Sequence, residues 1–301
     1  SCSTGGEWKI PSICRRNGEG RGELTMSIVE QEIAYVEEDL PSLDRQISVD
    51  WFSPRVLAAL NAHPLDNTIR YTSDRTFYVT WFDSAADRPS VSETVSVTTL
   101  VAASRHNPTI GSTHAAQDDD DEDRREVGIR THRWMECLLN GLPSVPGESA
   151  VHAQMHGYVN TLRTLLPWRT EMPIRSCTST CVVGVVDALF MVDACPEAED
   201  VLVLDMVDWK YSVDVTSCLE EYELQLNMYK YILETHYGGV PFQVGDNRWC
   251  TSIRIRHMSL VMFHASYTTH KEHPVQDRQA TVAAMFQARK TRLAPKDKCN
   301  T

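Results

Sequence analysis

Residues 201–210 read VLVLDMVDWK, and this run decides the fold. A short, nearly continuous apolar stretch rich in Val and Leu is typical of a strand that is buried on both faces. Side chains two residues apart in a strand share a face, so Asp208 and Lys210 are expected to project together, away from Asp205 and Trp209. Taken alone, an acid and a lysine at a strand end favour a surface ion pair over a functional site.

The run before it, CVVGVVDALFMV at residues 181–192, predicts a second buried strand and carries one acid, Asp187. An isolated buried carboxylate is costly, so it has to be solvated, paired or bound to a metal. If the two strands are neighbours, Asp187 and Asp208 converge, and two carboxylates in one site repel each other unless a cation lies between them. Oxygen ligands favour Mg²⁺ or Mn²⁺. The alternative is two unrelated acids at strand edges.

Helical and strand-like patterns alternate around these runs, which predicts an α/β or α+β core behind a smaller N-terminal module. We expect a flexible lead-in at residues 1–25, a helical and β-hairpin module at 26–140, and the core at 141–301. The expected helices span residues 28–40, 54–61, 130–139, 150–166, 219–237 and 274–292. The further expected strands span residues 76–82 and 94–101, which form a hairpin, and 251–255 and 259–264.

The net charge of −12 argues against a generic nucleic-acid coat, but the charge is uneven. Residues 251–301 hold nine Lys or Arg and three Asp or Glu, so this end is basic and suited to meet phosphate. Six consecutive acids, Asp118 to Asp123, lie in an expected exposed loop near residues 113–126, because like charges repel and stay solvated. A role in recruitment or in gathering Mg²⁺ is the alternative for this loop.

The cysteines and the apolar runs indicate a compartment. Nine scattered cysteines are an odd number, no signal peptide is recognisable, and reduced thiols inside the cell are the better interpretation. The longest apolar run has 12 residues, too few for a membrane span. We therefore expect an intracellular protein and no membrane partner, and we leave nucleus, viral factory and organelle open.

Two pairs of polar side chains are expected to share a helix face. Gln225 and Tyr229 lie four residues apart and can face the strand that carries Lys210. His152 and His156 have the same spacing, but Ala153 stands where a zinc-protease motif has its general base, which argues against zinc hydrolysis. His152 is either an extra ligand of a Mg²⁺ or Mn²⁺ site or a histidine on a helix surface.

Four motifs, in this order and spacing, resemble the PD-(D/E)XK nuclease superfamily. They are Gly147-x-x-x-x-His152, Gly184-x-x-Asp187, Asp208-Trp209-Lys210 and QLNMYKYILE at 225–234. The similarity is greatest to the RecB-like branch seen in large DNA viruses and phages. It covers residues 90–290 and is tightest over 147–238. It implies a restriction-endonuclease-like core with a central mixed sheet flanked by helices, and a metal-dependent DNA nuclease that is more exonuclease-like than endonuclease-like.

The resemblance also implies a ligand set for Mg²⁺ or Mn²⁺. Asp187 and Asp208 would bind the metal, and His152 would complete its coordination shell. Glu171 resembles an acid that often precedes the Gly-x-x-Asp strand, at a position that drifts among the members of the superfamily.

Three further residues receive roles from the same resemblance. Lys210 would stabilise the charged transition state or orient the attacking water, and the carboxylate of Asp208 would act with it. Gln225 and Tyr229 would support the site and contact DNA.

Basic side chains of the C-terminal region would bind the DNA backbone without reading its sequence. They are Arg254, Arg256, Arg289, Lys290 and Arg292, for which a solvated helix face is the alternative. The acidic overall charge also leaves room for a protein partner that recruits the DNA. Two competing interpretations stay open: a catalytically inactive nuclease-fold module for DNA binding or assembly, and a metal-dependent phosphoryl enzyme acting on RNA.

Overall fold

The computed structural model describes a little more than half of the chain. The described residues are 61–65, 69–71, 77–83, 88–91, 94–105, 119–142, 149–162, 165–176, 181–192 and 200–293. The chain divides into residues 1–43 and 44–301, and every described residue belongs to the second unit. The expected lead-in at 1–25 and the expected helices at 28–40 and 54–61 lie outside the described residues, apart from Asn61.

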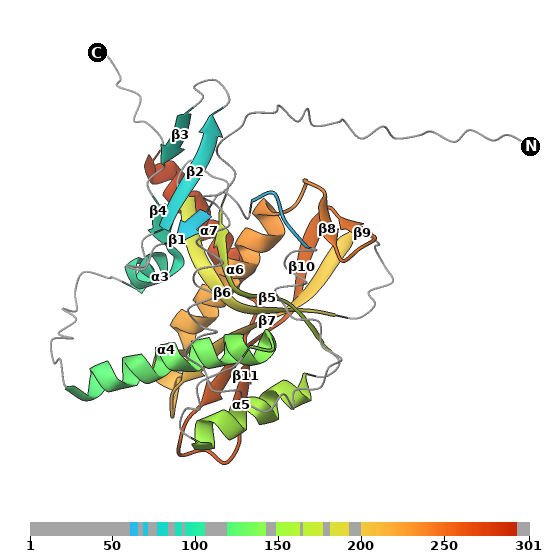
Figure 1. Ribbon diagram of the computed structural model, residues 1–301. Coiled ribbons are helices and arrows are strands. Elements are labelled where there is room, and N and C mark those ends of the chain that lie inside the picture. Colours follow the sequence, from blue (N-terminus) through green and yellow to red (C-terminus); the bar gives the residue numbers. More distant parts are fainter. Residues whose placement is uncertain are drawn as a thin grey trace, which may run out of the picture. The chain divides into compact units, whose positions relative to one another are not determined.

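The described chain is an α/β structure (Figure 1). Its strands are β1 (Ile69–Tyr71), β2 (Phe77–Asp83), β3 (Arg88–Val91), β4 (Thr94–Ser96), β5 (Leu166–Arg175), β6 (Cys181–Met191), β7 (Val201–Tyr211), β8 (Phe242–Val244), β9 (Arg248–Cys250), β10 (Ser252–Phe263) and β11 (Lys271–Pro274). Its helices are α3 (Val97–Arg105), α4 (Asp119–Leu139), α5 (Ser149–Thr161), α6 (Leu219–His236) and α7 (Gln279–Leu293), with a short 3-10 helix η2 (Thr216–Cys218) before α6.

A six-stranded mixed sheet forms the centre of this structure. Its strands follow the order β11-β10-β7-β6-β4, and β5 pairs with the other edge of β6. β10 runs parallel to β7 and β4 parallel to β6, whereas the β5–β6, β6–β7 and β10–β11 pairs are antiparallel. The remaining strands form a separate β1-β2-β3 sheet and the β8-β9 hairpin. The expected mixed sheet flanked by helices is confirmed.

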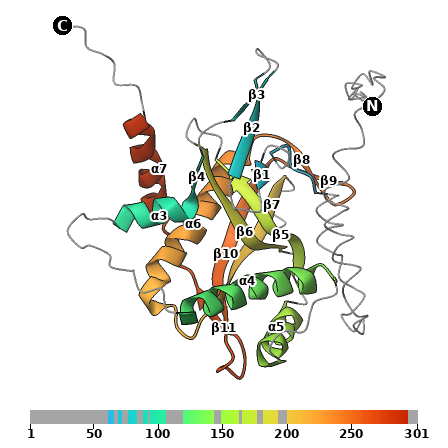
Figure 2. The same cartoon turned by 60° about the vertical axis from the view of Figure 1, so that its left-hand side comes forward.

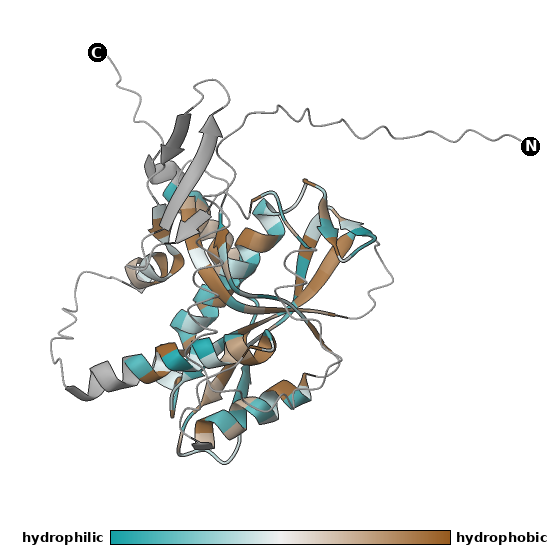
Figure 3. Ribbon diagram, in the orientation of Figure 1, coloured by the Kyte–Doolittle hydropathy of each residue, from teal (hydrophilic) through white to brown (hydrophobic). Residues whose placement is uncertain are grey.

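β6 and β7 are apolar on both faces because helices cover both faces of the sheet (Figures 1 and 2). On one face α6 contributes Leu226, Met228 and Ile232 to the core, all of them fully buried. On the other face α4 and α5 contribute buried side chains such as Met135 and Tyr158. Figure 3 shows the consequence, strands coloured mostly as hydrophobic and helices that alternate between hydrophilic and hydrophobic surfaces. The strands predicted from the runs at 181–192 and 201–210 and the helix predicted at 219–237 are confirmed.

The expected strand at residues 94–101 is only partly correct. It ends after β4, and α3 begins at Val97. The Ser96 hydroxyl accepts a hydrogen bond from the backbone N–H of Thr99 at 3.0 Å, which is the capping interaction that starts a helix. The expected hairpin partner of residues 76–82 is therefore wrong: β2 pairs with β3, and β4 joins the central sheet.

The acidic stretch also differs from the expectation. Residues from Asp119 onward belong to α4 rather than to a loop, and the expected helix at 130–139 is only its last half. Acids near a helix N-terminus are favoured by the helix dipole, which reconciles this composition with a helix. α4 packs against β7 and β5. The division of the chain expected at residue 140 stays a prediction.

Elements on the C-terminal side differ in detail. The expected strands at 251–255 and 259–264 are one strand, β10, whose register against β7 shifts between Ile255 and His257. The final helix begins at Gln279 because β11 occupies residues 271–274. β5 was not expected at all, since Pro167 and Pro173 interrupt its pattern. Proline is tolerated there because β5 pairs, among the described strands, with β6 only.

Candidate metal centre

The two central strands separate at the level of Asp187. The β6–β7 ladder runs from Met191↔Leu204 to Ala188↔Val207. Beyond it, the backbone N–H of Trp209 donates to Oδ2 of Asp187 at 2.8 Å instead of to a β6 carbonyl. The other edge of β6 is occupied by β5 throughout this region. A side-chain carboxylate thus takes the place of a backbone acceptor where β7 leaves β6.

Three carboxylates form a row across three neighbouring strands. Thr170↔Ala188 and Met172↔Val186 are the flanking pairs of the β5–β6 ladder, which leaves Glu171 opposite Asp187. Continuing the β6–β7 register by one residue leaves Asp208 opposite Asp187 on the other side. Glu171 has a φ of 45°, a left-handed conformation that is rare outside glycine and concentrates at functional sites. The kink falls at one of two interruptions of the β5–β6 ladder; the other is the register shift between Pro167 and Arg169.

Lys210 projects from the same face of β7 as Asp208, as the strand alternation predicts. Its Nζ lies 2.6 Å from Oδ2 of Asp208 and 4.7 Å from the centre of the Tyr222 ring. Trp209 points to the opposite face and packs edge-on to Tyr158, with ring centroids 5.6 Å apart. The Asp208–Lys210 pair is therefore a buried ion pair rather than the surface pair that the sequence alone favoured.

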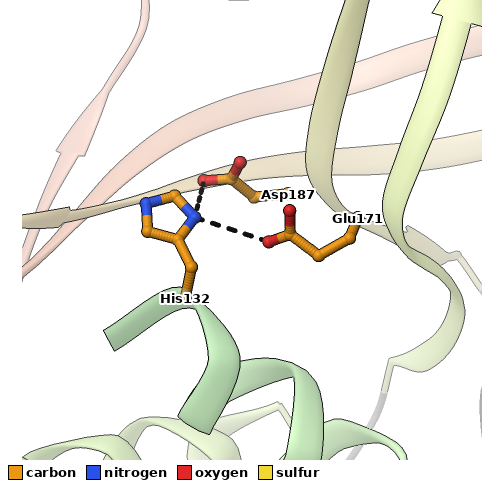
Figure 4. A group of neighbouring side chains, drawn as sticks. All are labelled: His132, Glu171 and Asp187. Carbon is orange, nitrogen blue, oxygen red and sulfur yellow. Dashed lines mark hydrogen bonds and ion pairs between the residues drawn. The ribbon is translucent and has the colours of Figure 1, made fainter. Parts of the chain in front are cut away.

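His132 of α4 joins the row from the side (Figure 4). Its Nδ1 lies 3.4 Å from Oε1 of Glu171 and 3.4 Å from Oδ2 of Asp187. The three ligand atoms lie within 4.8 Å of one another, close enough for one ion to contact them all. Asp208 lies outside this closest group and faces it from β7. We call His132, Glu171, Asp187, Asp208 and Lys210 the acidic centre.

Burial and mutual charge set the protonation of the acidic centre. Burial disfavours the His132 cation, but the Asp187 and Glu171 carboxylates more than compensate and raise the pKa of His132 to about 10. Burial raises the pKa of Glu171 to about 7, although His132 acts in the other direction. Burial would also raise the pKa of Asp187, but His132, Lys210 and the Trp209 N–H together lower it.

Asp208 is the least satisfied member. Burial is the largest effect and raises its pKa to about 6, and Asp187 adds to the shift while Lys210 opposes it. Its side chain is 3% exposed. Apart from the Lys210 ion pair, the carboxylate meets no hydrogen-bond donor among the described residues. A buried carboxylate with spare acceptor capacity is costly unless a cation or ordered water completes its contacts.

The acidic centre fits a divalent cation. Three carboxylates and one imidazole are ligands that Mn²⁺ accepts, and the carboxylates are ligands that Mg²⁺ prefers. Like charges in a row repel one another, and a bound dication would offset that repulsion. The clustering of His132, Glu171 and Asp187 rests on the positions of their ligand atoms, and the binding and identity of an ion stay a prediction.

Gln225 and Tyr229 of α6 lie near the acidic centre: burial, and then the charges of Asp208 and Asp187, raise the pKa of Tyr229. The Gln225 amide donates to the Tyr229 hydroxyl at 2.9 Å, which confirms that they share a helix face. A Cβ on Gly184 would lie 2.4 Å from Cε1 of Tyr229, so only glycine leaves room for this ring. The glycine of the Gly184-x-x-Asp187 motif therefore has a packing reason.

The expected ligand His152 is not part of the acidic centre. It lies on α5 with its ring 4.6 Å from that of His156 and 6.4 Å from that of Trp134. Burial, together with His156, lowers its pKa. The histidine that meets the carboxylates is His132, which sequence reasoning missed. The available signal was its place three residues before the core residue Met135, on the same helical stripe.

The predicted DNA-binding cations are dispersed. The Arg256 guanidinium forms two hydrogen bonds with Asp205, at 3.0 and 2.6 Å. Arg254 is exposed and Arg289 is half-buried on α7. The side chains of Lys290 and Arg292 lie outside the described part of the structure. A role of these residues in DNA binding stays a prediction.

Comparisons with known proteins add little to this description. No family model matches the chain, and no curated protein is significantly similar to it. Among similar solved structures is one titled "Crystal structure of SSO0001", which is 11% identical, with a TM-score of 0.29 over 70% of this chain and 82% of that chain. A similarity at this TM-score carries no argument about fold or function. Among the described residues, no helix is long and apolar enough to cross a membrane.

Proposed function

We propose that this protein is a divalent-metal-dependent phosphodiesterase that cleaves DNA. The observation that supports the proposal is the row of Glu171, Asp187 and Asp208 across β5, β6 and β7, with His132 beside Glu171 and Asp187 and with Lys210 beside Asp208. A site built only for stability has no use for two buried carboxylates beside a half-buried third, because a buried carboxylate is costly. The resemblance of the sequence motifs to PD-(D/E)XK nucleases supports DNA as the substrate.

His132, Glu171 and Asp187 would hold Mg²⁺ or Mn²⁺, and Asp208 would complete the set from β7. The imidazole ligand favours Mn²⁺ over Mg²⁺, because Mg²⁺ prefers oxygen ligands alone. Such an ion, when bound, supplies positive charge to the scissile phosphate and makes water a better nucleophile.

Lys210 would supply a second positive charge. Burial disfavours its cation, but Asp208 and Asp187 raise the pKa of Lys210 above its ordinary value. It therefore stays an ammonium group and serves as a fixed charge rather than as a base. The ion pair with Asp208 orients it, so that its charge is in place where negative charge develops on the phosphate.

The test is a cleavage assay on the full chain with linear single-stranded, linear duplex and circular duplex DNA. Each substrate is incubated with Mg²⁺, with Mn²⁺ or with a chelator. We expect metal-dependent cleavage that is faster with Mn²⁺, and linear substrates preferred if the enzyme works from ends. Binding of DNA without cleavage in either metal would instead support the inactive binding module, and cleavage of RNA alone would support the RNA enzyme.

Matched variants assign the activity to the acidic centre. Asp208→Asn and Lys210→Ala are each expected to lower the cleavage rate at least about 100-fold while DNA binding survives. Asp246→Asn is the control, because it removes a carboxylate from the exposed β8–β9 turn instead. Cleavage at the wild-type rate by either Asp208→Asn or Lys210→Ala would remove both residues from the mechanism.

A further inference from the structure

Aromatic side chains gather at the end of the strand that carries Lys210. The rings of Tyr211 and His264 lie 5.0 Å apart and 37° from parallel, and the Tyr267 ring lies 5.8 Å from that of His264. The Lys271 ammonium sits 4.0 Å from the centre of the Tyr267 ring. We call Tyr211, His264, Tyr267 and Lys271 the aromatic platform.

The aromatic platform adjoins the acidic centre through the backbone. Tyr211 directly follows Lys210, and consecutive Cα atoms are about 3.8 Å apart. β7 and β10 run parallel, so their C-terminal ends lie side by side, and Ser212 N–H donates to the Phe263 carbonyl at 3.2 Å. Lys210 projects toward α6 and Tyr211 toward α5. A strand of DNA that passes around this end of β7 would meet both.

The loop that carries the platform is held in place by a buried side chain. The Gln154 amide of α5 donates to the carbonyls of His264 and Tyr267, at 2.8 Å each, and accepts from the backbone N–H of His264 at 3.2 Å. The Tyr267 hydroxyl donates to the carbonyl of Val213 in the loop after β7. Figures 1 and 2 show the segment between β10 and β11 beside α5. The rings are therefore positioned in advance of any ligand.

The platform is nevertheless open to solvent. Tyr211, His264 and Tyr267 are half-buried and Lys271 is exposed. Val213, in the loop that Tyr267 contacts, is 55% exposed. Aromatic rings and a cation that are held in place yet left accessible are the features on which unpaired bases stack. Asp214, an exposed acid of the same loop, makes the surface a poor general binder of phosphate.

We propose that the aromatic platform stacks an unpaired base next to the phosphate to be cleaved, so that the preferred substrate is single-stranded DNA or the frayed end of a duplex. The inference rests on the proposed function for the identity of the ligand. Base pairs inside a duplex cover their faces with neighbouring pairs, so only an unpaired base offers a face to these rings.

Binding of a fluorescent thymidine oligonucleotide and of a blunt duplex of equal length tests the platform. The protein is the full chain carrying Asp208→Asn, in chelator, so that cleavage does not interfere. We expect tighter binding of the single strand. Tyr267→Leu should weaken that binding five- to fifty-fold, whereas Tyr267→Phe, which keeps the ring and loses the hydroxyl, should stay within about twofold. Trp249→Ala is the matched control, since Trp249 is 59% exposed in the separate β8–β9 hairpin, and it should have no effect.

Equal losses from Tyr267→Phe and Tyr267→Leu would overturn the proposal, because the hydroxyl contact of the loop and not the ring would then be responsible. Equal affinity for single strand and duplex in the parent would overturn it as well. Cleavage by the wild-type chain with no effect of Tyr267→Leu leaves the proposed function standing and this inference refuted. Ring-dependent binding of the single strand, without cleavage in any metal, would support this inference and refute the proposed function.

Discussion

The backbone N–H of Trp209 donates a hydrogen bond to the side chain of Asp187, so a carboxylate substitutes for the strand partner that the N–H would otherwise have. Because of this contact, the Trp209 N–H keeps a hydrogen-bond acceptor where β7 separates from β6. An unpaired buried N–H would be costly. It also holds Asp187 toward the space between the strands, where Glu171, Asp208 and His132 converge.

Asp208→Asn is expected to stabilise the metal-free protein near pH 8. The pKa of Asp208 is raised from 3.8 to about 6, so the folded state binds the proton more tightly than the unfolded state. Protonation of Asp208 makes its full contribution to the free energy of unfolding below pH 3.8, and this contribution is lost as the pH rises through about 6. Asn mimics the neutral acid, and we expect a gain on the order of 1–3 kcal/mol.

Urea denaturation in chelator, near pH 8 and near pH 4, measures this effect. The gain should be present at the higher pH and nearly absent at the lower one. A variant that is less stable than the wild type at the higher pH would contradict the prediction, and would mean that the Lys210 ion pair outweighs the cost of burying the carboxylate.

Gly184→Ala is expected to destabilise the protein, because the new Cβ would lie 2.4 Å from Cε1 of Tyr229. Overpacking of this kind costs about 1–3 kcal/mol. Gly157→Ala in α5 is the matched control: its Cβ would meet nothing within 4 Å, and alanine favours a helix by about 0.5–1 kcal/mol. Thermal or urea unfolding of both variants should show a loss of stability for Gly184→Ala and a gain for Gly157→Ala. A stabilised Gly184→Ala would show that the Tyr229 ring moves aside freely.

His132→Ala is expected to weaken Mn²⁺ binding at least tenfold, whereas His152→Ala leaves it unchanged, because His132 lies 3.4 Å from the Glu171 and Asp187 carboxylates and the His152 ring packs against that of His156. Titration calorimetry with each variant measures the affinities. The opposite ranking would restore His152 as the ligand that the sequence motif implied.

Mn²⁺ binding is also expected to release a proton from His132. The pKa of His132 in the metal-free protein is about 10, and a metal ligand must be deprotonated, so affinity should rise with pH below that value. Calorimetry in buffers with different ionisation enthalpies counts the released protons. His132→Ala should release fewer; an identical proton count in the wild type and the variant would assign the release to another group.

Arg256→Ala is expected to lower stability modestly, by roughly 0.5–1.5 kcal/mol, because it removes both hydrogen bonds to Asp205. We expect little loss of DNA affinity, since the guanidinium is already engaged by a carboxylate on the strand face opposite Asp208. Arg254→Ala, at an exposed position of the same strand, provides the comparison in a DNA-binding assay. Unchanged stability together with weaker DNA binding would return Arg256 to the role predicted from the sequence.

The strands and helix nearest the site were predictable from local pattern. β6, β7 and α6 are continuous apolar or amphipathic segments, and the common face of Asp208 and Lys210 follows from strand alternation alone. β5 escaped prediction because its prolines and charged residues mask a strand that pairs along one edge. The switch from β4 to α3 depends on a single capping serine, Ser96, within a run of β-favouring residues.

The sequence by itself therefore determined that two aspartates and a lysine lie on two buried strands, because period and hydrophobicity act over a few residues. That these two strands are neighbours was settled by the tertiary structure. Only the tertiary structure decided which histidine joins them and that Glu171 turns inward. Those choices depend on how α4 packs across the sheet and on a ladder interruption in β5, which bring together His132 and Glu171 from positions 39 residues apart. Packing between distant segments is set by the fit of whole faces, and no local pattern encodes it.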